Sequence, residues 1–488
     1  MLGGEILHRK SDTWSSMSLS LLILLIYNPF LITSLGVLLS YGGIIGIITL
    51  NKTVLNLLDK IKIKNKKYKY RINRKLKKLI QYIKETLAIS ISVQLVIIPI
   101  IAIFFNTIGI SFIITSIILN IIIEPIVLVG FVAIVISFIS IQLFKFISII
   151  LISFLKILIL TSKLGQWIPF SKIYIVTPSI ITILIYYCNI YILNAFLKIY
   201  NTKNVTSFYY RIRNIISLIK YNLKKNKKKF YSFFLIVCIV WSFIIIVPHN
   251  LKIYFIDVGQ GDSTLIVTPK KQTILIDGGG SENSSFDVGK RTLLPYLLDR
   301  KINKIDYIII SHFDQDHIGG LLTIMQELEV RQVIVAKQGE TSEHYGNFKK
   351  IVKEKKIKVV VVEKGERIKI EKDLYFDILW PNNSNFISEN VLNNNSIACK
   401  LCYENFSMLF TGDIEEIAER KILQEYKNNI HVLSSTILKV GHHGSKTSST
   451  QDFLNAVKPK LALIGVGENN KFGHPSDEVV ERLDKIRN

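Results

Sequence analysis

Long apolar runs alternate with charged loops over the first half of the chain. Runs with few charges lie at residues 17–27, 30–50, 87–105, 110–123, 125–144, 146–160, 174–197 and 230–247. Several of them reach the roughly 20 residues that an α-helix needs to span a bilayer, while the runs at 17–27 and 110–123 are shorter. The pattern predicts a polytopic α-helical membrane domain over residues 1–248.

The hydrophobic pattern changes at residue 251. Short runs that alternate in polarity or are continuously apolar follow one another, among them KIYFIDVG, QTILIDGGG, DYIIISH, SMLFTGD and STILKVGHH. Helical patterns intervene at about residues 291–300, 319–329, 414–426 and 450–457. This alternation predicts an α/β sandwich over residues 251–488, with two sheets inside and helices outside, in the order αββα.

Composition and charge agree with a membrane protein. Of the 488 residues, 49% are hydrophobic, which is too many for a soluble chain of this length. Residues 52–85 carry 13 Lys or Arg against two acidic residues, and residues 198–229 carry 10 against none. Basic loops of membrane proteins stay on the cytoplasmic side, so we expect both loops there; a nucleic-acid-binding role is the alternative.

If both basic loops are cytoplasmic, an even number of crossings must separate them. Five candidate runs lie between residues 87 and 197. The run at 110–123 is expected not to cross, because Asn120, Glu124 and Pro125 follow or interrupt it and polar groups at membrane depth need protein or water as partners. The run at 230–247 then crosses outward and leaves the α/β domain on the extracytoplasmic side.

The segment SHFDQDHIGG carries the strongest chemical signal. Four side chains of metal-ligand type, His312, Asp314, Asp316 and His317, follow directly on the apolar run DYIII. A single His after a strand is more often a hydrogen-bonded structural residue. Here, however, two more polar sets also follow strands, TGD at 411–413 and GHHGS at 441–445. Side chains on such loops can converge, so the sequence predicts a metal site.

The four cysteines offer a weaker signal. Cys399 and Cys402 form a CxxC pair, which in another setting could bind zinc or form a disulfide. Alternation along a strand places their side chains on opposite faces. We therefore expect ordinary strand residues.

The order of these motifs resembles the metallo-β-lactamase domain of the ComEC family of DNA-uptake channels. HxDxDH, TGD and LKVGHHGS occur in that order, preceded by FIDVGQGDS and LIDGG and followed by FGHPS. In the first half, SLGVLLSYGG and the stretch from QLVIIPI to IIIEPIV resemble the competence domain of the same family. The resemblance implies a multi-pass protein of the bacterial cytoplasmic membrane.

The resemblance also implies two metal positions that share one carboxylate. Their ligands would be His312 and Asp314 for one ion and Asp316 and His317 for the other, with Asp413 bridging and His442 or His443 completing the set; of the last two we expect His442. Asp314 replaces a histidine of the usual HxHxDH pattern, so Mn²⁺ becomes a competitor to Zn²⁺.

Other polar residues of these motifs have open roles. The usual third histidine of the first position is missing, and Asn394, Asn395 and Ser396 stand there as either turn residues or auxiliary groups. We expect Asp257 and Asp262 to support ligands rather than to bind metal.

Two cations a few ångströms apart suit the hydrolysis of a phosphodiester, because they lower the pKa of a bridging water and neutralise the attacking and leaving oxygens. We therefore expect a metal-dependent nuclease or phosphodiesterase. Asp316 would orient the nucleophile, and the phosphate or leaving group would meet His443, His474 or Lys446.

The resemblance implies DNA uptake in natural transformation, with DNA and the membrane as partners. Full-length family members have a further N-terminal domain and further strands after the FGHPS region. We therefore expect the α/β domain to lack its last strands, and other competence proteins or a separate chain to supply the missing N-terminal part. A membrane-tethered metallohydrolase without a transport role is the alternative, and a remnant that only binds is a third possibility.

Overall fold

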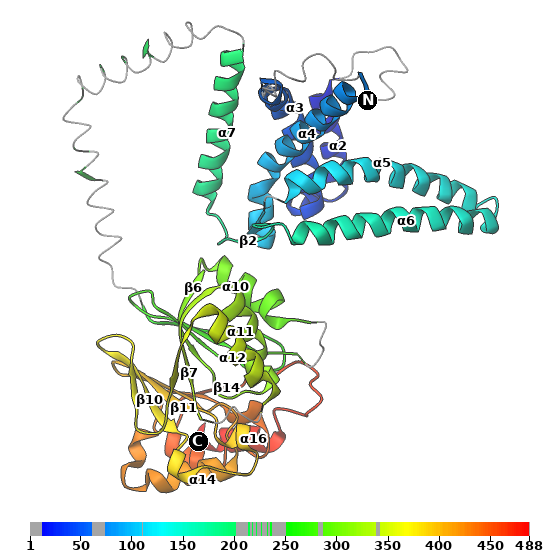
Figure 1. The fold of residues 1–488 in the computed structure, drawn as a ribbon. Helices are drawn as coiled ribbons and strands as arrows, with labels where there is room; N and C mark the ends of the chain where they lie inside the picture. The colour runs from blue at the N-terminus through cyan, green and yellow to red at the C-terminus, as the bar shows by residue number, and fades with distance from the viewer. Residues whose placement is uncertain are drawn as a thin grey trace. The chain divides into compact units, whose positions relative to one another are not determined.

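The structure is a computed structural model that describes residues 12–60, 74–109, 111–201, 250–281, 286–337 and 342–487, with isolated positions between 213 and 236. The chain divides into two compact units, Met1–Cys238 and Ile239–Asn488 (Figure 1). Each unit is described by itself.

The first unit is α-helical. Its elements are α2 (Thr13–Tyr27), the short helix η1 (Pro29–Thr33), α3 (Leu35–Lys60), α4 (Arg74–Phe105), α5 (Phe112–Ser137), α6 (Ile141–Gln166) and α7 (Ile180–Asn201), with a two-stranded ribbon of β1 (Thr107–Ile108) and β2 (Ile173–Tyr174). By length and composition, five of the described helices, α3 to α7, can cross a membrane. This confirms the predicted helical membrane domain.

The break expected around Pro125 is wrong. Residues 110–123 and 125–144 do not form two segments, because α5 runs through Pro125 and ends at Ser137, and α6 begins at Ile141. Ser140 ends the connection: its hydroxyl oxygen accepts a hydrogen bond from the N–H of Leu143 and caps α6. Proline is tolerated inside apolar membrane helices, where neighbouring groups can compensate for its missing N–H.

Helices α3, α4 and α7 are joined by small residues and polar contacts. Gly46 of α3 packs on the backbone of α4 so closely that a Cβ at this position would clash with the carbonyl oxygen of Ser92. Pro99 has no N–H, so it cannot donate to the carbonyl of Leu95 four residues earlier. The hydroxyl of Tyr186 on α7 donates to that carbonyl instead, at 2.8 Å.

The second unit is a sandwich of two six-stranded sheets. The first sheet has the order β3-β4-β5-β6-β7-β8 and the second the order β14-β13-β12-β11-β10-β9. The strands of the first are β3 (Lys252–Phe255), β4 (Thr264–Val267), β5 (Thr273–Ile276), β6 (Lys304–Ile309), β7 (Glu329–Val335) and β8 (Lys358–Val361). Those of the second are β9 (Arg367–Lys369), β10 (Leu374–Trp380), β11 (Ala398–Tyr403), β12 (Phe406–Phe410), β13 (Ile437–Lys439) and β14 (Leu461–Leu463).

Helices cover the outer faces of both sheets (Figure 1). These are α10 (Leu294–Asp299), α11 (Gln315–Glu327) and α12 (Glu343–Lys355) on the first sheet, and α14 (Glu416–Glu425), α15 (Gln451–Val457) and α16 (Asp477–Arg487) on the second. The inner faces meet in one core that includes Ile274, Ile309, Phe376 and Leu401. The predicted αββα sandwich is therefore confirmed.

The strand directions place the polar motifs together. Strands β5 to β8 are parallel to one another, and so are β12 to β14. The loops after β5, β6, β12 and β13 begin at residues 277, 310, 411 and 440. They carry DGGG, SHFDQDH, TGD and GHHGS, and all of them meet at one edge of the sandwich.

The two cysteines behave as predicted. Cys399 is buried and Cys402 is half-buried on the same strand, and both are free thiols.

Candidate metal centre

The loop after β6 supplies two buried and two more exposed side chains. His312 follows the strand, and His317 lies in the first turn of α11; both rings are fully buried. The carboxyl side chains of Asp314 and Asp316 keep 40% and 31% of their surface exposed. The segment thus points two imidazoles into the molecule and leaves two carboxylates at the mouth of a cleft.

Tight turns after β12 and β13 bring in the remaining groups. Gly412 has φ +55°, and a Cβ there would lie 2.8 Å from the Cβ of Ser396, so only glycine fits without displacement. Asp413 follows it and is almost fully buried. His443 also has positive φ, +53°, in the turn formed by GHHG.

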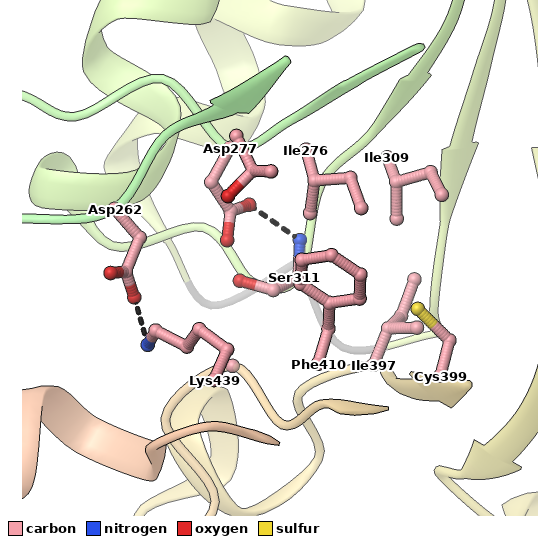
Figure 2. Close-up of a pocket in the computed structure, with 11 residues that line it drawn as sticks. Asp262, Ile276, Asp277, Ile309, Ser311, Ile397, Cys399, Phe410 and Lys439 are labelled. Atoms are coloured by element: carbon pink, nitrogen blue, oxygen red, sulfur yellow. Dashed lines mark hydrogen bonds and ion pairs between the residues drawn. The ribbon is translucent and has the colours of Figure 1, made fainter. Parts of the chain in front are cut away.

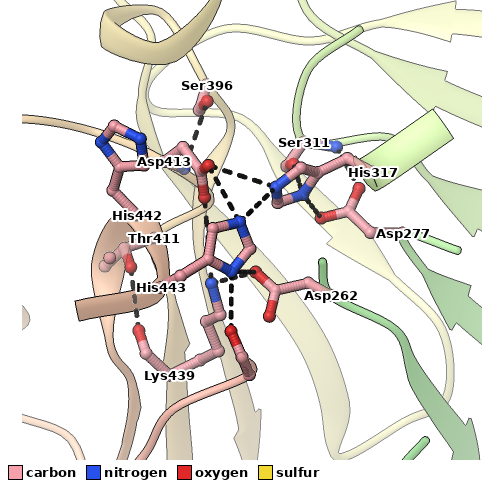
Figure 3. Close-up of polar contacts among 12 residues, drawn as sticks. Asp262, Asp277, Ser311, His317, Ser396, Thr411, Asp413, Lys439, His442 and His443 are labelled. Carbon is pink, nitrogen blue, oxygen red and sulfur yellow. Dashed lines mark hydrogen bonds and ion pairs between the residues drawn. The ribbon is translucent and has the colours of Figure 1, made fainter. Parts of the chain in front are cut away.

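Three donor atoms from these loops, of His317, Asp413 and His443, converge on one point (Figure 3), and Asp316 adjoins His443. Nε2 of His317 lies 3.2 Å from Oδ2 of Asp413 and 3.3 Å from Nε2 of His443. Nε2 of His443 lies 3.3 Å from the same oxygen of Asp413 and 3.2 Å from Oδ2 of Asp316. Ligands about 2.0 Å from a tetrahedral ion are about 3.3 Å apart, so the donor set fits a metal ion.

A second set adjoins the first through Asp413. Nε2 of His312 lies 3.4 Å from Oδ2 of Asp314 and 3.9 Å from Oδ2 of Asp413. Within the described part of the chain this buried nitrogen has no hydrogen-bond partner. Buried polar atoms are rarely left without one, so an ion between His312, Asp314 and Asp413 would satisfy it.

Neighbouring groups fix which imidazole nitrogens face the cluster. Oδ2 of Asp277 lies 3.0 Å from Nδ1 of His317, and Oδ1 of Asp277 accepts the N–H of Ser311 at 2.8 Å. Nδ1 of His443 lies 2.7 Å from the carbonyl oxygen of Gly465, to which it donates. Both rings therefore present Nε2 to the proposed metal, the arrangement typical of histidine ligands.

The charges of the cluster reinforce one another. Burial opposes ionisation of Asp413, but His317 and His443 outweigh it and hold the pKa of this carboxyl well below its usual range. Burial also opposes a charge on His443, yet Asp413 and Asp262 raise its pKa to about 10. Burial would raise the pKa of Asp316, but His317 and His443 lower it. Such concentrated opposite charges are common at functional sites.

Asp262 and Lys439 lie behind the cluster. Nζ of Lys439 forms an ion pair with Asp262 and lies 4.0 Å from Oδ1 of Asp413 (Figures 2 and 3). Oδ2 of Asp262 is 3.8 Å from Nδ1 of His443, the nitrogen that faces away from the other donors. Asp262 is close enough to His317, Asp413 and His443 to be counted with them as a candidate ligand, but Lys439 already neutralises its charge.

The two adjacent histidines occupy different positions in the site. His443, expected to meet substrate, contacts Asp316, His317 and Asp413, whereas His442, expected to bind metal, does not complete that set. Nδ1 of His442 lies instead 3.5 Å from Oε1 of Glu415, and the ring lines the cleft. We therefore propose that His443 binds metal and that His442 meets the substrate.

The other expected groups lie outside the cluster. The ring of His474 stacks on Phe472, with 5.9 Å between ring centroids, and Lys446 is exposed. Neither is among the residues that line the described cleft. Asn394 donates from its amide to Glu415, and the hydroxyl of Ser396 accepts the N–H of Asp413 at 3.4 Å, so this segment supports the TGD turn.

Comparison with known proteins assigns both halves of the chain. Residues 1–198 match the family model "Competence protein", and residues 256–468 match the model "Metallo-beta-lactamase superfamily". The chain thus combines a competence-protein domain with a metallo-beta-lactamase domain. The resemblance to the ComEC family is confirmed at the level of these two domains.

Individual relatives agree with this assignment. The chain is 30% identical over 264 residues to "ComE operon protein 3" of Bacillus subtilis, which covers 51% of this chain and 33% of the relative. It is 32% identical over 234 residues to "Recombination protein 2" of Haemophilus influenzae, covering 48% and 26%. The chain spans about a third or less of the length of these relatives.

Among solved structures, the metallo-beta-lactamase fold protein YhfI of Bacillus subtilis shares 11% identity over 48% of this chain and 92% of that chain, with a TM-score of 0.31. The family and the cluster together indicate a divalent-metal site in the second unit.

Proposed function

We propose that this chain acts in DNA uptake across the cytoplasmic membrane and that its second unit is a metal-dependent nuclease. The competence-protein match supports the role in uptake. The observation that carries the nuclease is the convergence of donor atoms of His317, Asp413 and His443 at 3.2–3.3 Å, with Asp316 3.2 Å from His443 and with His312 and Asp314 beside them.

The site holds two divalent ions, Mn²⁺ or Zn²⁺. Asp262 and Lys439 neutralise each other, which leaves the four carboxylates of Asp277, Asp314, Asp316 and Asp413. Two divalent cations balance these four negative charges. When bound, the ions activate a water and stabilise the charge of a phosphodiester.

The cleft above the cluster has room for a nucleic-acid strand. It has a volume of about 900 Å³. Its lining includes Asp314, Asp316, Asp413 and His442, together with polar and aromatic residues such as Asn469, Asn470, Lys471 and Phe472. From residue 251 onward the chain has 32 Lys or Arg and 32 Asp or Glu. A neutral unit binds a polyanion weakly and in a salt-sensitive way, so delivery of DNA by the first unit matters more than affinity.

Asp316 and His442 divide the proton transfers. Asp316 has Oδ2 3.2 Å from Nε2 of His443 and part of its surface in the cleft, so it orients the attacking water. His442 is placed to give a proton to the leaving oxygen, because its ring lines the cleft and Glu415 holds its Nδ1. The contact with His442 at 3.5 Å is the main cause that lowers the pKa of Glu415, so this partner stays ionised.

The proposed topology places the second unit outside the cytoplasm. Four candidate spans, α4 to α7, lie between the basic loops at 52–85 and 198–229, which is an even number. Both loops can therefore be cytoplasmic without any segment failing to cross. The run at 230–247, which would complete the topology, is described only at isolated positions. Reporter fusions at Thr268 test this, and a fusion active only in the cytoplasm contradicts it.

The nuclease is tested with the full chain purified in detergent. Loaded with Mn²⁺ at low salt, it should cut end-labelled DNA without marked sequence preference, and Asp413→Asn should abolish cleavage. Equal cleavage by both proteins contradicts the proposal. Hydrolysis of a small phosphodiester but never of DNA favours the membrane-tethered phosphoesterase.

A further inference from the structure

A lysine stands at the base of the metal centre. Lys439 is the last residue of β13 and is 5% exposed. It enters the interior between the sheets, where Ile276, Ile309 and Phe410 line the same small cavity (Figure 2). That cavity has a volume of about 10 Å³, room for about one water, so solvent cannot replace the hydration shell of an ammonium group.

The ammonium contacts two carboxylates that have different positions. One is Asp262, its ion-pair partner, whose Oδ2 is 3.8 Å from Nδ1 of His443. The other is Asp413, whose Oδ1 is 4.0 Å from Nζ. The other oxygen of Asp413, Oδ2, lies 3.2 Å from Nε2 of His317 and 3.9 Å from Nε2 of His312.

Asp413 therefore offers one oxygen to the metal positions and the other to a fixed cation. A carboxylate between two ions can otherwise rotate and give one oxygen to each. Opposite charges at this distance, away from water, interact strongly enough to hold the carboxylate in one orientation.

We propose that Lys439 is a positioning residue that restrains Asp413 so that only Oδ2 is shared between the two metal ions. This inference rests on the proposed metal centre. It assigns to the lysine a role beyond neutralising Asp262.

The two roles are separated by removing Lys439 with and without Asp262. Lys439→Met alone leaves Asp262 as a buried unpaired charge. This destabilises the fold whether or not Lys439 also orients Asp413. Lys439→Met combined with Asp262→Asn removes both charges, so stability should recover. The changed orientation of Asp413 then remains.

The readout is Co²⁺ binding by the full chain in detergent, followed by the visible absorption spectrum, which reports the ligand geometry independently of activity. In the double variant we expect a thermal midpoint close to wild type, an altered Co²⁺ spectrum, and about 10- to 100-fold weaker binding of at least one ion, as for other residues that orient metal ligands. Recovery of both stability and the wild-type spectrum overturns the inference.

Two controls complete the test. If the double variant does not fold by circular dichroism, Lys439→Met with Asp262→Leu gives the same comparison, because an apolar pair often replaces a buried ion pair without loss of stability. If the wild-type protein itself binds no Co²⁺, the proposed metal centre is wrong. If the variant binds Co²⁺ with an unchanged spectrum, only the role of Lys439 is wrong.

Discussion

The Nε2 atoms of His317 and His443 lie 3.3 Å apart, although 126 residues separate them in the chain. One belongs to the first turn of α11 on the first sheet, and the other to the turn after β13 on the second. Two imidazoles held this close on a shared carboxylate, with their Nδ1 atoms both engaged elsewhere, are arranged for a common cation.

Adjacent histidines should therefore respond differently to substitution. His443→Ala removes one of the three convergent donors, so the ion bound with His317 should be lost. His442→Ala leaves that donor set intact and removes the proposed proton donor, so metal content should stay at the wild-type level while DNA cleavage falls about 10²- to 10⁴-fold, the usual contribution of a general acid.

Elemental analysis of the purified proteins measures this pair. His344→Ala is a matched control, because His344 lines the same cleft without belonging to the cluster. If His442→Ala loses metal while His443→Ala retains it fully, His442 is the metal ligand, as expected from the sequence.

The metal position at His312 should be separable from the one at His317 and His443. His312→Ala removes a buried nitrogen that lies 3.4 Å from Asp314 and leaves Asp316, His317 and His443 in place. We expect one ion per chain in place of two, with the remaining ion bound through Asp413. Titration with Mn²⁺ and counting of bound ions by mass spectrometry measures the change; a variant that still binds two ions contradicts the shared-carboxylate arrangement.

The sequence predicted the neighbourhood of the site but not its finer geometry. HxDxDH, TGD and GHHGS each follow a strand, and parallel strands bring such loops to one edge, so their meeting could be foreseen. Which of His442 and His443 faces inward could not, because both have positive φ, +44° and +53°, in a turn where side-chain direction follows no simple period.

Lys439 was missed for a different reason. A lysine at the end of a short strand ordinarily points to solvent, and only the packing of the second sheet against the first buries this one. The signal that could have revealed it is the motif LKVGHHGS itself, in which the lysine follows an apolar run directly and stands three residues before the first histidine.

Two helices were not predicted from the sequence, and the reason lies in their composition. Helices α12 and α16 are rich in charged residues and bury few side chains, among them Phe348, Ile351 and Val479. Most of their residues are charged or polar, so no apolar run marks them in the sequence. Conversely, Pro125 suggested a helix end that the apolar setting of α5 does not require.

A buried carboxyl outside the metal centre should govern the pH dependence of stability. Glu419 on α14 is 1% exposed and accepts the N–H groups of Ser449 and Thr450 at 2.5 and 2.8 Å. Burial is the main cause that raises its pKa to about 7 from 4.5. Because the folded pKa is above the unfolded one, its contribution is full below about pH 4.5 and is lost as the pH rises to about 7, a change of about 3 kcal/mol.

Glu419→Gln should remove this contribution to the pH dependence. Urea unfolding of the metal-free protein between pH 4.5 and 8 measures it for both proteins. The free energy of unfolding should fall less steeply with rising pH in the variant, whatever its absolute stability. Parallel curves for the two proteins would show that Glu419 does not titrate in this range.

The contact between Tyr186 and Leu95 should be linked to Pro99. The proline removes the helix donor for the Leu95 carbonyl, and the Tyr186 hydroxyl replaces it at 2.8 Å. Tyr186→Phe should therefore destabilise the first unit by about 1 kcal/mol, typical of a hydrogen bond between membrane helices. In a Pro99→Ala background the backbone N–H returns, and the same substitution should cost much less.

Thermal unfolding in detergent of the wild type, the two single variants and the double variant gives the coupling between the two positions. Tyr191→Phe on the same helix is the matched control, since Tyr191 is 74% exposed and its loss of a hydroxyl should change the stability by less than about 0.5 kcal/mol. If Tyr186→Phe costs the same with proline or alanine at position 99, the hydroxyl does not substitute for the missing helix donor. A positive coupling would instead show that α7 stabilises α4 at the point where its own backbone hydrogen bonding is broken.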